Sequence, residues 1–543
     1  MPRPTHVRYA VLAVATAAAA LLYLERVCIA MASGYIREDL GLSPAQISLA
    51  LGMFFWAYAL AQVPSGWLTD RFGPRRMMTI YLVAWSVFGV SIAVAPNFEL
   101  LLAARFALGL SQAGAYPTLS VVVKRWTPIA ARGVASSIVS FGGRFGGAGA
   151  NLLTALLIVW FVPLSTSARL ERGDLLDAPA LEKQLTAEQQ NPRSPWRASL
   201  ATRLLVLGGE EERLAELNTL IGQPGSFDAI LPEGADLPAE ARALANKSPA
   251  ERTPAESQRL NRLLAEQAFP QTIRQLYGAG WRPALLVYGM LGVLAGALFW
   301  FVVRDEPTDH PRVNALEASW IAAGQVASPR APPRAIPWRR LAGSLNLAWF
   351  SSLQFFTNIG WAFIITLMPD YLAETFNVPI EQRGLMTTMP LIGGCVGTLL
   401  GGWLTDRLVA PLGLRWARSI PLGGLKVLCI AAMLACPWLN SAWAVTIALT
   451  LMSAGVDLAG PATWSLAQDV GGREVGSVLG WGNMWGNFGA GLSPMLLRSI
   501  QQHSGWHTAF FLCAGAFVFA GMAGLLCDAT RLLEPLAETR TDD

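Results

Sequence analysis

Two adjacent charged residues, Glu25 and Arg26, interrupt an apolar run that extends from about residue 10 to residue 31. At a rise of about 1.5 Å per residue, a helix of this length crosses a bilayer core of about 30 Å, so both side chains would lie at membrane depth. Such a residue costs roughly 2.5 to 3.5 kcal/mol at a helix centre and is retained where it faces protein or water. Successive helix positions point about 100° apart, so the two side chains need separate environments. The alternative is a neighbouring ion pair that satisfies itself; we favour a functional role.

Three arginines, Arg26, Arg105 and Arg144, fall in apolar segments of the first 165 residues. A guanidinium group stays protonated and offers a planar fork that matches a carboxylate, so an anionic ligand is its natural counter-charge. For Arg105 the alternative is a structural role, in which it reaches the interface or braces helices. For Arg144 the alternative is an ion pair with a distant acid such as Asp457. Lys426 is either a further anion contact or the partner of Asp457.

The composition indicates a protein with many membrane helices. Of 543 residues, 53% are hydrophobic and only 14% are charged, which departs strongly from a soluble globular average. The net charge of +4 is too small to indicate nucleic-acid binding. Six cysteines fall in apolar segments and do not indicate a disulfide framework. We therefore expect an integral membrane protein that contacts the lipid bilayer and has no nucleic-acid partner. Our further expectations are a location in the plasma (inner) membrane and a monomer.

Enzymatic chemistry has little support in the sequence. A membrane enzyme would need a nucleophile, a metal cluster or an acid–base pair at an interface. The only four histidines are scattered near the ends of apolar segments: His6, His310, His503 and His507. We therefore expect no catalytic activity, no cofactor and no metal site.

Apolar stretches between loop signals predict an all-α polytopic membrane protein with twelve transmembrane helices. Six come before a long interruption and six after it. The expected spans are 9–32, 47–68, 77–96, 99–121, 134–162, 282–303, 346–369, 384–405, 419–437, 442–464, 475–498 and 507–528. Basic residues concentrate in three loops on the side of the N-terminus: after span two, between spans four and five, and before span seven. By the positive-inside rule, both termini are expected to be cytoplasmic.

One segment, residues 166–280, does not fit the pattern of spans. It holds 16 acidic and 13 basic residues and no histidine or cysteine. We interpret it as an extracytoplasmic insert that forms a small helical cap or a partly disordered loop. The expected domain ranges are 1–165 for helices one to five, 166–280 for the insert, 281–303 for helix six, 304–344 for a cytoplasmic linker, 345–530 for the second bundle and 531–543 for a cytoplasmic tail.

A repeated motif follows the second helix of each half. Trp-Leu-Thr-Asp-Arg occurs at residues 67–71 and again at 403–407. An aspartate at such a helix end can pair with arginines of the next loop and with the positive end of a helix, in a contact that is made in one arrangement of the halves and broken in another. A basic loop that only sets topology would need neither the aspartate nor a second copy. The predicted gating residues are Gly66, Asp70, Arg71, Gly73, Arg75, Arg76, Asp406 and Arg407.

The first copy resembles the hallmark motif of the major facilitator superfamily, Gly-x-Leu-x-Asp-Arg-x-Gly-x-Arg-Arg. The resemblance covers both halves and implies two six-helix bundles, a site near the midplane and alternating access. Further motifs are similar to the anion:cation symporters, a group with sugar-acid and sialin-like carriers. These are Tyr-Leu-Glu-Arg at 23–26, Trp-Ala-Tyr at 56–58, Arg105 with Gly109 and Pro117, Pro-Asp-Tyr-Leu at 369–372, Asp-Glu-Pro at 305–307 with His310-Pro311, Trp464, Gly482-Asn483 and Gly486-Asn487.

The resemblance implies roles for individual residues. In the resembled group the arginine beside the acidic residue of the first helix binds the substrate carboxylate, a role that falls here to Arg26. Glu25 is then the proton-coupling candidate, and Tyr58, Trp464 and Asn483 match positions that line a sugar-acid pocket. We add Arg144 to the expected substrate-binding residues. Weaker lining candidates are Tyr23, Arg105, Gln112, Gln354 and Asn358.

Two departures from the resembled pattern change the expected charge of the cavity. A glutamine, Gln112, stands where sugar-acid importers have a proton-carrying glutamate, and an arginine, Arg144, stands where they have a neutral polar residue. One negative charge is lost and one positive charge is gained. We infer either a substrate with more negative charge, or coupling that differs from proton symport.

The sequence therefore predicts a secondary transporter that imports a small organic anion, such as a hexuronate or aldonate, by alternating access, with protons as the candidate coupling ion. The runner-up is an exchanger of inorganic anions or sugar phosphates, because an extra arginine suits phosphate equally well. An alternative of another class is a transporter-like sensor that uses the 166–280 insert.

Overall fold

The computed structural model describes residues 3–175, 178–190, 201–207, 209–227, 239–269, 272–323, 335–376, 378 and 380–533. Most of the expected tail and residues 324–334 of the expected linker therefore lie outside the described residues. The described chain is helical, apart from one isolated antiparallel bridge between Leu175 and Ile273.

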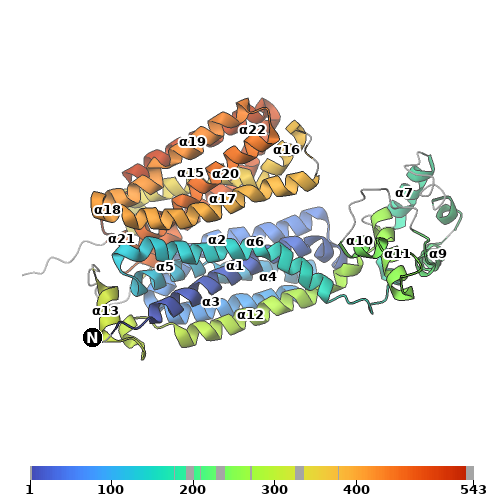
Figure 1. Ribbon diagram of the computed structural model, residues 1–543, viewed down its shortest axis with the longest axis horizontal. Helices are drawn as coiled ribbons and strands as arrows, with labels where there is room; N and C mark the ends of the chain where they lie inside the picture. The colour runs from blue at the N-terminus through green and yellow to red at the C-terminus, as the bar shows by residue number, and fades with distance from the viewer. Residues whose placement is uncertain are drawn as a thin grey trace, which may run out of the picture.

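The first bundle is built from seven helical pieces that pack side by side (Figure 1). They are α1 (Val7–Asp39), α2 (Pro44–Phe72), α3 (Pro74–Ala93), α4 (Phe98–Gln112), α5 (Ala115–Trp126), α6 (Arg132–Trp160) and α12 (Trp281–Val302). Predicted span four is divided into α4 and α5. The ring of Tyr81 packs against Gly114 at this break, and its hydroxyl donates to the carbonyl oxygen of Ser65 at 2.8 Å.

The second bundle contains helices with more breaks than the first. Its elements are α14 (Trp338–Gly343), α15 (Leu345–Thr366), α16 (Met368–Phe376), α17 (Ile380–Arg407), α18 (Val409–Ser419), a π-helical turn (Ile420–Gly424), α19 (Lys426–Ala435), α20 (Ala442–Leu458), α21 (Gly460–Val470) and α22 (Val475–Leu526). Spans eleven and twelve, predicted as separate, form the two arms of α22. The arms meet at Gly505, whose φ of 79° is accessible to glycine and breaks the helix.

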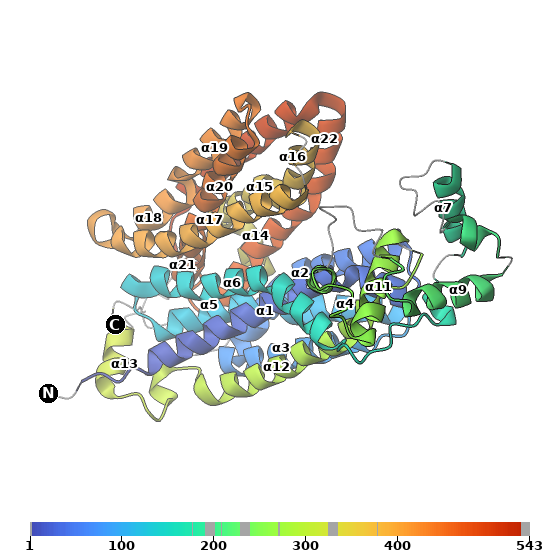
Figure 2. The same cartoon turned by 45° about the vertical axis from the view of Figure 1, so that its right-hand side comes forward.

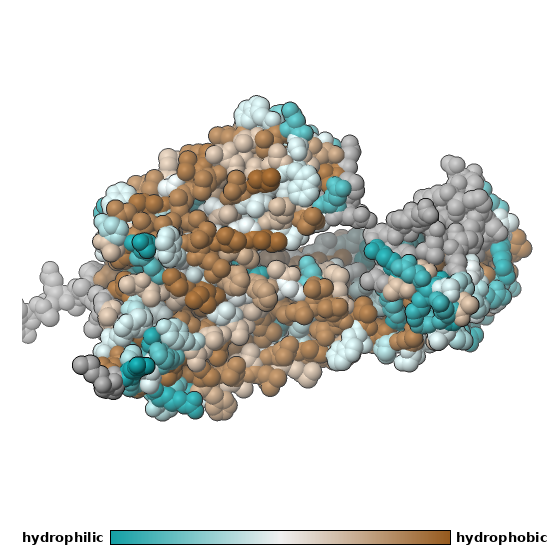
Figure 3. Space-filling model, viewed as in Figure 1, coloured by the Kyte–Doolittle hydropathy of each residue, from teal (hydrophilic) through white to brown (hydrophobic). Residues whose placement is uncertain are grey.

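Among the described residues, nine helices are long and apolar enough to cross a membrane. The nine count the two arms of α22 as one. The α15–α16 pair, bent by 50°, adds a tenth where it is counted as one span. Helix α6, with 29 residues, runs alongside α1 and α17. Hydrophobic side chains cover the length of both bundles, and hydrophilic ones gather at their ends (Figure 3). These features confirm the predicted all-helical membrane architecture.

The two bundles are not parallel. They converge at the end that carries the chain termini, called the termini end below, and diverge toward the end near residues 166–280, called the insert end (Figure 2). This arrangement leaves the middle of α1 and α6 facing the second bundle.

The segment between α6 and α12 folds into short helices beyond the insert end of the first bundle (Figures 1 and 2). They include α7 (Ala178–Gln190), α9 (Glu210–Gly222), α10 (Ala239–Ala245) and α11 (Pro254–Ala268). Leu217, Phe227 and Leu263 are buried in it and belong to the same apolar cluster as the first bundle. The segment thus packs onto the first bundle, and Gln275 fastens it by donating from its side-chain amide to the Glu38 carboxylate of α1 at 3.0 Å.

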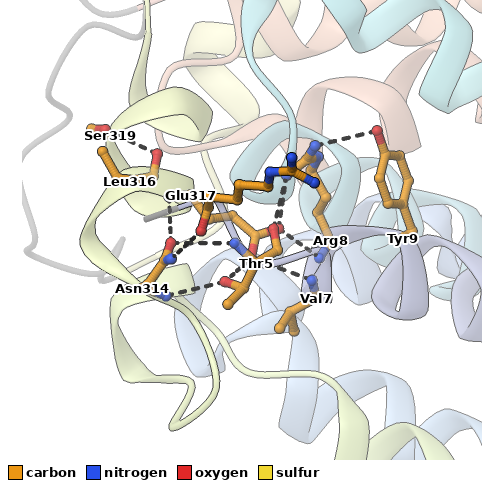
Figure 4. A network of polar contacts seen from close by, with 9 residues as sticks. Thr5, Val7, Arg8, Tyr9, Asn314, Leu316, Glu317 and Ser319 are labelled. Carbon is orange, nitrogen blue, oxygen red and sulfur yellow. Dashed lines mark hydrogen bonds and ion pairs between the residues drawn. The ribbon is translucent and has the colours of Figure 1, made fainter. Parts of the chain in front are cut away.

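The first part of the expected linker is tied to the start of α1 through one buried carboxylate (Figure 4). Glu317, on α13 (Ala315–Ala322), accepts hydrogen bonds from Thr5 Oγ1 at 2.5 Å, from the backbone N–H of Val7 at 3.3 Å and from the Arg8 guanidinium at 3.0 Å. Burial acts to raise the pKa of Glu317, but these hydrogen bonds outweigh it and hold the pKa below its usual value. Helix α13 therefore belongs with the first bundle.

We expect Glu317→Ala to destabilise the protein by about 3 to 5 kcal/mol, because removing one partner of a buried ion pair leaves the other charge uncompensated. The side chains of Arg8 and Glu317 are only 9% and 0% exposed. Thermal unfolding in detergent measures the loss. The matched control is Glu306→Ala, which removes a carboxylate that is 48% exposed and pairs with Arg125; it should cost about 1 kcal/mol or less. Equal losses of stability in both variants would contradict a stabilising role for the buried Arg8–Glu317 ion pair.

Candidate substrate site between the two bundles

The termini end is closed by an aspartate of the first bundle that binds the start of a helix in the second. The Asp70 carboxylate accepts hydrogen bonds from the backbone N–H groups of Gly476 and Ser477 and from the Ser477 hydroxyl, each at 2.8 Å. These residues form the first turn of α22, where unpaired N–H groups and the helix dipole favour a negative charge. The contact fastens α2 to the opposite bundle.

The second copy of the motif makes the equivalent contact in the opposite direction. Asp406 accepts from the backbone N–H groups of Gly133 and Val134, at 2.8 and 2.7 Å, at the start of α6. Of the partners predicted for the motif aspartates, both aspartates contact helix ends. The motif arginines are seen on aromatic rings instead: Arg71 lies 5.1 Å from the Trp67 ring centroid, and Arg75 lies 3.9 Å from that of Trp300.

Glycines at these contacts let the helix backbones approach closely. A Cβ on Gly66 would overlap the carbonyl group of Gly476, and a Cβ on Gly402 would lie 2.7 Å from the carbonyl oxygen of Gly133. Gly66, predicted as part of the gating motif, therefore allows α2 to approach α22 closely. Gly402 has the same role between α17 and α6. Gly73 has a different reason: its φ of 86° connects α2 to α3, and its neighbour is the Asp305 carboxylate.

Further polar contacts join the bundles at the same end. Asp469 of α21 accepts from Arg132 of the first bundle at 2.7 Å and from Arg418 of its own bundle at 2.9 Å. Gln468 donates to the Ser120 hydroxyl at 3.1 Å. All five side chains are buried, so the termini end is sealed by charges and hydrogen bonds that are compensated locally.

Arg26 lies beyond this sealed end, among aromatic rings. Its guanidinium carbon is 4.3 Å from the ring centroid of Tyr58, 4.9 Å from that of Tyr23 and 5.2 Å from that of Phe54. Cation–π contacts stabilise the charge but leave N–H groups available. Two nitrogens of the group, Nε and Nη2, are buried and have no hydrogen-bond partner among the described residues. An acidic ligand would supply that partner.

Tyr116 extends the aromatic cluster from the first bundle to the second. Its ring centroid lies 5.9 Å from that of Tyr23 and 5.2 Å from that of Trp464, which is on α21. The structure thus brings Arg26, Tyr23, Tyr58 and Trp464 into one cluster. Sequence reasoning missed Tyr116, which directly precedes Pro117 at the start of α5; the nearby helix break was the only signal that could have found it.

Arg144 is also an electrostatic neighbour of Tyr23 and Tyr116, so the two arginines face the same rings. Its guanidinium forms a close ion pair with the carboxylate of Asp457 on α20. The alternative stated for Arg144 is therefore what the structure shows, and a substrate-binding role for it stays a prediction. The pair joins the bundles near the middle of α6.

Glu25 faces away from this interface. It lies in a small pocket inside the first bundle, lined also by Cys28, Arg105 and Tyr288, and it is 5% exposed. Neither carboxylate oxygen has a hydrogen-bond partner among the described residues. Arg105 braces α4 against α2 by donating to the carbonyl oxygens of Ala50 at 3.2 Å and Leu51 at 3.3 Å. These contacts agree with the structural role given as the alternative for Arg105, in which it braces helices.

The other predicted site residues make contacts outside the aromatic cluster. Gln112 is fully buried in the first bundle, and both its polar atoms lack a partner among the described residues. Gln354 and Asn358 face Gly486 on the first arm of α22, and the Asn358 amide donates to the Gln354 carbonyl within α15 at 2.8 Å. Asn483 is half-buried one turn earlier on the same arm.

We expect Gly66→Ala to open the termini end. The new methyl group would overlap the Gly476 carbonyl, and overpacking of this kind costs about 1 to 3 kcal/mol, so the closed arrangement should lose about tenfold in population. Distances between spin labels on α3 and α18 measure the opening, and Gly402→Ala should have the same effect. The control is Gly52→Ala on the same helix, where nothing lies within 4 Å of the added atom. An unchanged distance distribution in Gly66→Ala would refute the close-approach argument.

Comparison with known proteins places this geometry in a family. The chain matches the Major Facilitator Superfamily over residues 15–166, 275–494 and 350–540. It is 25% identical to a probable sulfoacetate transporter of Cupriavidus necator, over 92% of this chain and 89% of that protein. It is 22% identical to a probable galactarate/D-glucarate transporter of Escherichia coli, over 96% and 92%. A probable L-galactonate transporter of the same species is also 22% identical, over 97% and 89%.

Solved structures support the same assignment at the level of the fold. The transporter FucP in its outward conformation superposes with a TM-score of 0.59 at 14% identity, covering 96% of this chain and 99% of that chain. The match of the family over both halves, the repeated aspartate motif and the two helical bundles agree. The chain belongs to the Major Facilitator Superfamily of membrane transporters and is not an enzyme.

Proposed function

We propose that this transporter carries a small organic anion with two acidic groups, bound between the bundles and moved by alternating access. The observation that carries the proposal is the buried guanidinium of Arg26, whose Nε and Nη2 lack hydrogen-bond partners among the described residues. Guanidinium groups favour carboxylate, sulfonate or phosphate partners because the planar fork donates two parallel hydrogen bonds.

The charge of the interface supports a substrate with two acidic groups. Arg26, Arg144 and Lys426 contribute three positive charges near the interface, and Asp457 contributes one negative charge. Among the described residues counted here, two positive charges therefore remain in excess in a region of low dielectric. A dianion would neutralise both, whereas a singly charged acid would leave one.

The relatives agree with this charge count in part. Sulfoacetate carries a carboxylate and a sulfonate, and galactarate and glucarate carry two carboxylates each. Galactonate has one carboxylate, so the relatives as a group support an organic acid and do not select between one charge and two. The extra arginine, Arg144, is what favours the dianion. The same chemistry favours an exchanger of sugar phosphates or inorganic phosphate as the second candidate.

We propose that the termini end is cytoplasmic, because the basic loops lie on that side. The contacts of Asp70 and Asp406 then close the cytoplasmic side, and the bundles diverge toward the outside (Figure 2). The protein would act as a monomer in the inner membrane, with the insert outside the cell. The sensor alternative predicts no flux at all.

We expect the protein in liposomes to take up galactarate and sulfoacetate, and Arg26→Ala to lower their kcat/KM by about 100-fold or more. Truncating one partner of a buried charge pair costs about 2 to 5 kcal/mol. The control is Arg415→Ala, which removes an arginine that is 48% exposed and lies 5.3 Å from the Trp416 ring, outside the interface. Unchanged transport by Arg26→Ala would contradict the proposed role of Arg26 in substrate binding. Uptake of phosphates alone would select the exchanger.

We propose Glu25 as the proton-binding residue, since it is a buried carboxylate of the first bundle without a hydrogen-bond partner among the described residues. We expect uptake into liposomes to be driven by external acid in the native protein and not in Glu25→Gln, which cannot exchange a proton. Exchange of internal for external substrate should persist in the variant, which shows that it folds and binds. Acid-driven uptake retained by Glu25→Gln would remove Glu25 from the coupling mechanism.

A further inference from the structure

Two arginine–aspartate pairs join the same two lines of helices. Arg132 and Arg144 are twelve residues apart on α6, and Asp457 and Asp469 are twelve residues apart on α20 and α21. At about 1.5 Å per residue the two pairs are separated by about 18 Å along the helices. One pair lies at the termini end, and the other lies deeper, beside the aromatic cluster that contains Tyr116.

The two pairs differ in their surroundings. The pair at the termini end is buried on both sides, with 3% exposure for Arg132 and 2% for Asp469, and Arg418 adds a second cation. In the deeper pair the Arg144 side chain is 26% exposed, whereas Asp457 is 8% exposed. Part of the Arg144 side chain is therefore accessible, whereas the Asp457 side chain is nearly closed off.

Asp457 has a second cation within its own bundle. Lys426, on α19, is 1% exposed and interacts electrostatically with Asp457. Gly394 of α17 packs directly on the Asp457 carboxylate, beside the Ser453 hydroxyl. If Arg144 left Asp457, the carboxylate would still have Lys426 as its counter-charge, so the separation would strand no uncompensated anion.

We propose that Asp457 is a built-in competitor of the substrate: its carboxylate holds Arg144 until an acidic group of the substrate replaces it, and Lys426 then compensates Asp457. The proposal rests on the proposed function. Arg26 binds the first acidic group, and Arg144 is released only to the second. Asp457 thereby sets the preference between acids with one and two charges, because a singly charged acid satisfied by Arg26 has no group that displaces Asp457.

The first test is Asp457→Asn, with binding of galactarate and galactonate to the purified protein measured by calorimetry. Without the competing carboxylate, Arg144 is always available to the substrate. The apparent affinity for galactarate then rises by the inverse of the fraction of native protein in which Arg144 is not paired with Asp457. For an available fraction of about one tenth, the Kd of galactarate should fall about tenfold. The Kd of galactonate should change by less than about twofold, because that acid does not use Arg144.

The second test is Lys426→Met, for which the proposal predicts the opposite sign. Displaced Asp457 would lack a counter-charge, so galactarate should bind about tenfold more weakly and galactonate should be little affected. This variant also serves if Asp457→Asn does not fold. The matched control is Asp469→Asn, the same chemical change in the pair at the termini end, which should leave the galactarate-to-galactonate ratio of Kd values unchanged.

Three outcomes would overturn the inference. If folded Asp457→Asn binds galactarate with unchanged or weaker affinity, the Arg144–Asp457 ion pair is a structural contact that the substrate does not displace. Equal shifts for both acids would show a general field effect. If the galactarate-to-galactonate ratio of Kd values changes as much in Asp469→Asn as in Asp457→Asn, a change in how the bundles are placed explains the effect. If the native protein binds neither acid, the proposed function fails instead, so the two failures are distinguishable.

Discussion

The rest of the structure depends on one kind of contact, a carboxylate at the end of one helix that binds the first turn of a helix in the opposite bundle. Asp70 makes it with α22, and Asp406 makes it with α6. Each carboxylate satisfies backbone N–H groups that the helix itself cannot, in a setting where the helix dipole adds to the attraction. Because both contacts lie at the same end, they hold the bundles together there. Deeper along the helices the bundles meet through the Arg144–Asp457 ion pair and the Tyr116–Trp464 ring contact.

Much of this arrangement could be predicted from the sequence, because hydropathy and an exact pentapeptide repeat are both visible in one chain. The partners of the aspartates could not. A backbone N–H group carries no residue signature, and Asp70 and Gly476 are more than 400 positions apart. Nearby arginines looked like natural partners, but Arg75 uses its backbone N–H and side chain on Asp305 and Trp300. The break at Gly505 was visible by contrast, since it lies in the gap between predicted spans eleven and twelve.

At the candidate site, the sequence indicated which side chains lie apart but not which side chains of the two bundles meet. The 100° offset between neighbours indicated that Glu25 and Arg26 need different environments, and the structure places Glu25 inside the first bundle and Arg26 among rings at the interface. Tyr116 could not be recognised, since an aromatic residue in a membrane helix is more often packing, and its role depends on Trp464 from the other bundle. The sequence alone did not decide whether Arg144 binds a ligand or pairs with Asp457, because Asp457 also comes from the other bundle.

The departure at Arg144 gains a physical meaning from its ion pair with Asp457. An added arginine in a membrane interior requires an anion, and Asp457 supplies one from the opposite bundle. A counter-charge across the interface differs from one on the same helix, because its attraction depends on how the bundles are placed. The charge proposed to bind a ligand is then also a charge that positions the bundles, so a ligand that competes for Arg144 necessarily acts on the contact between them.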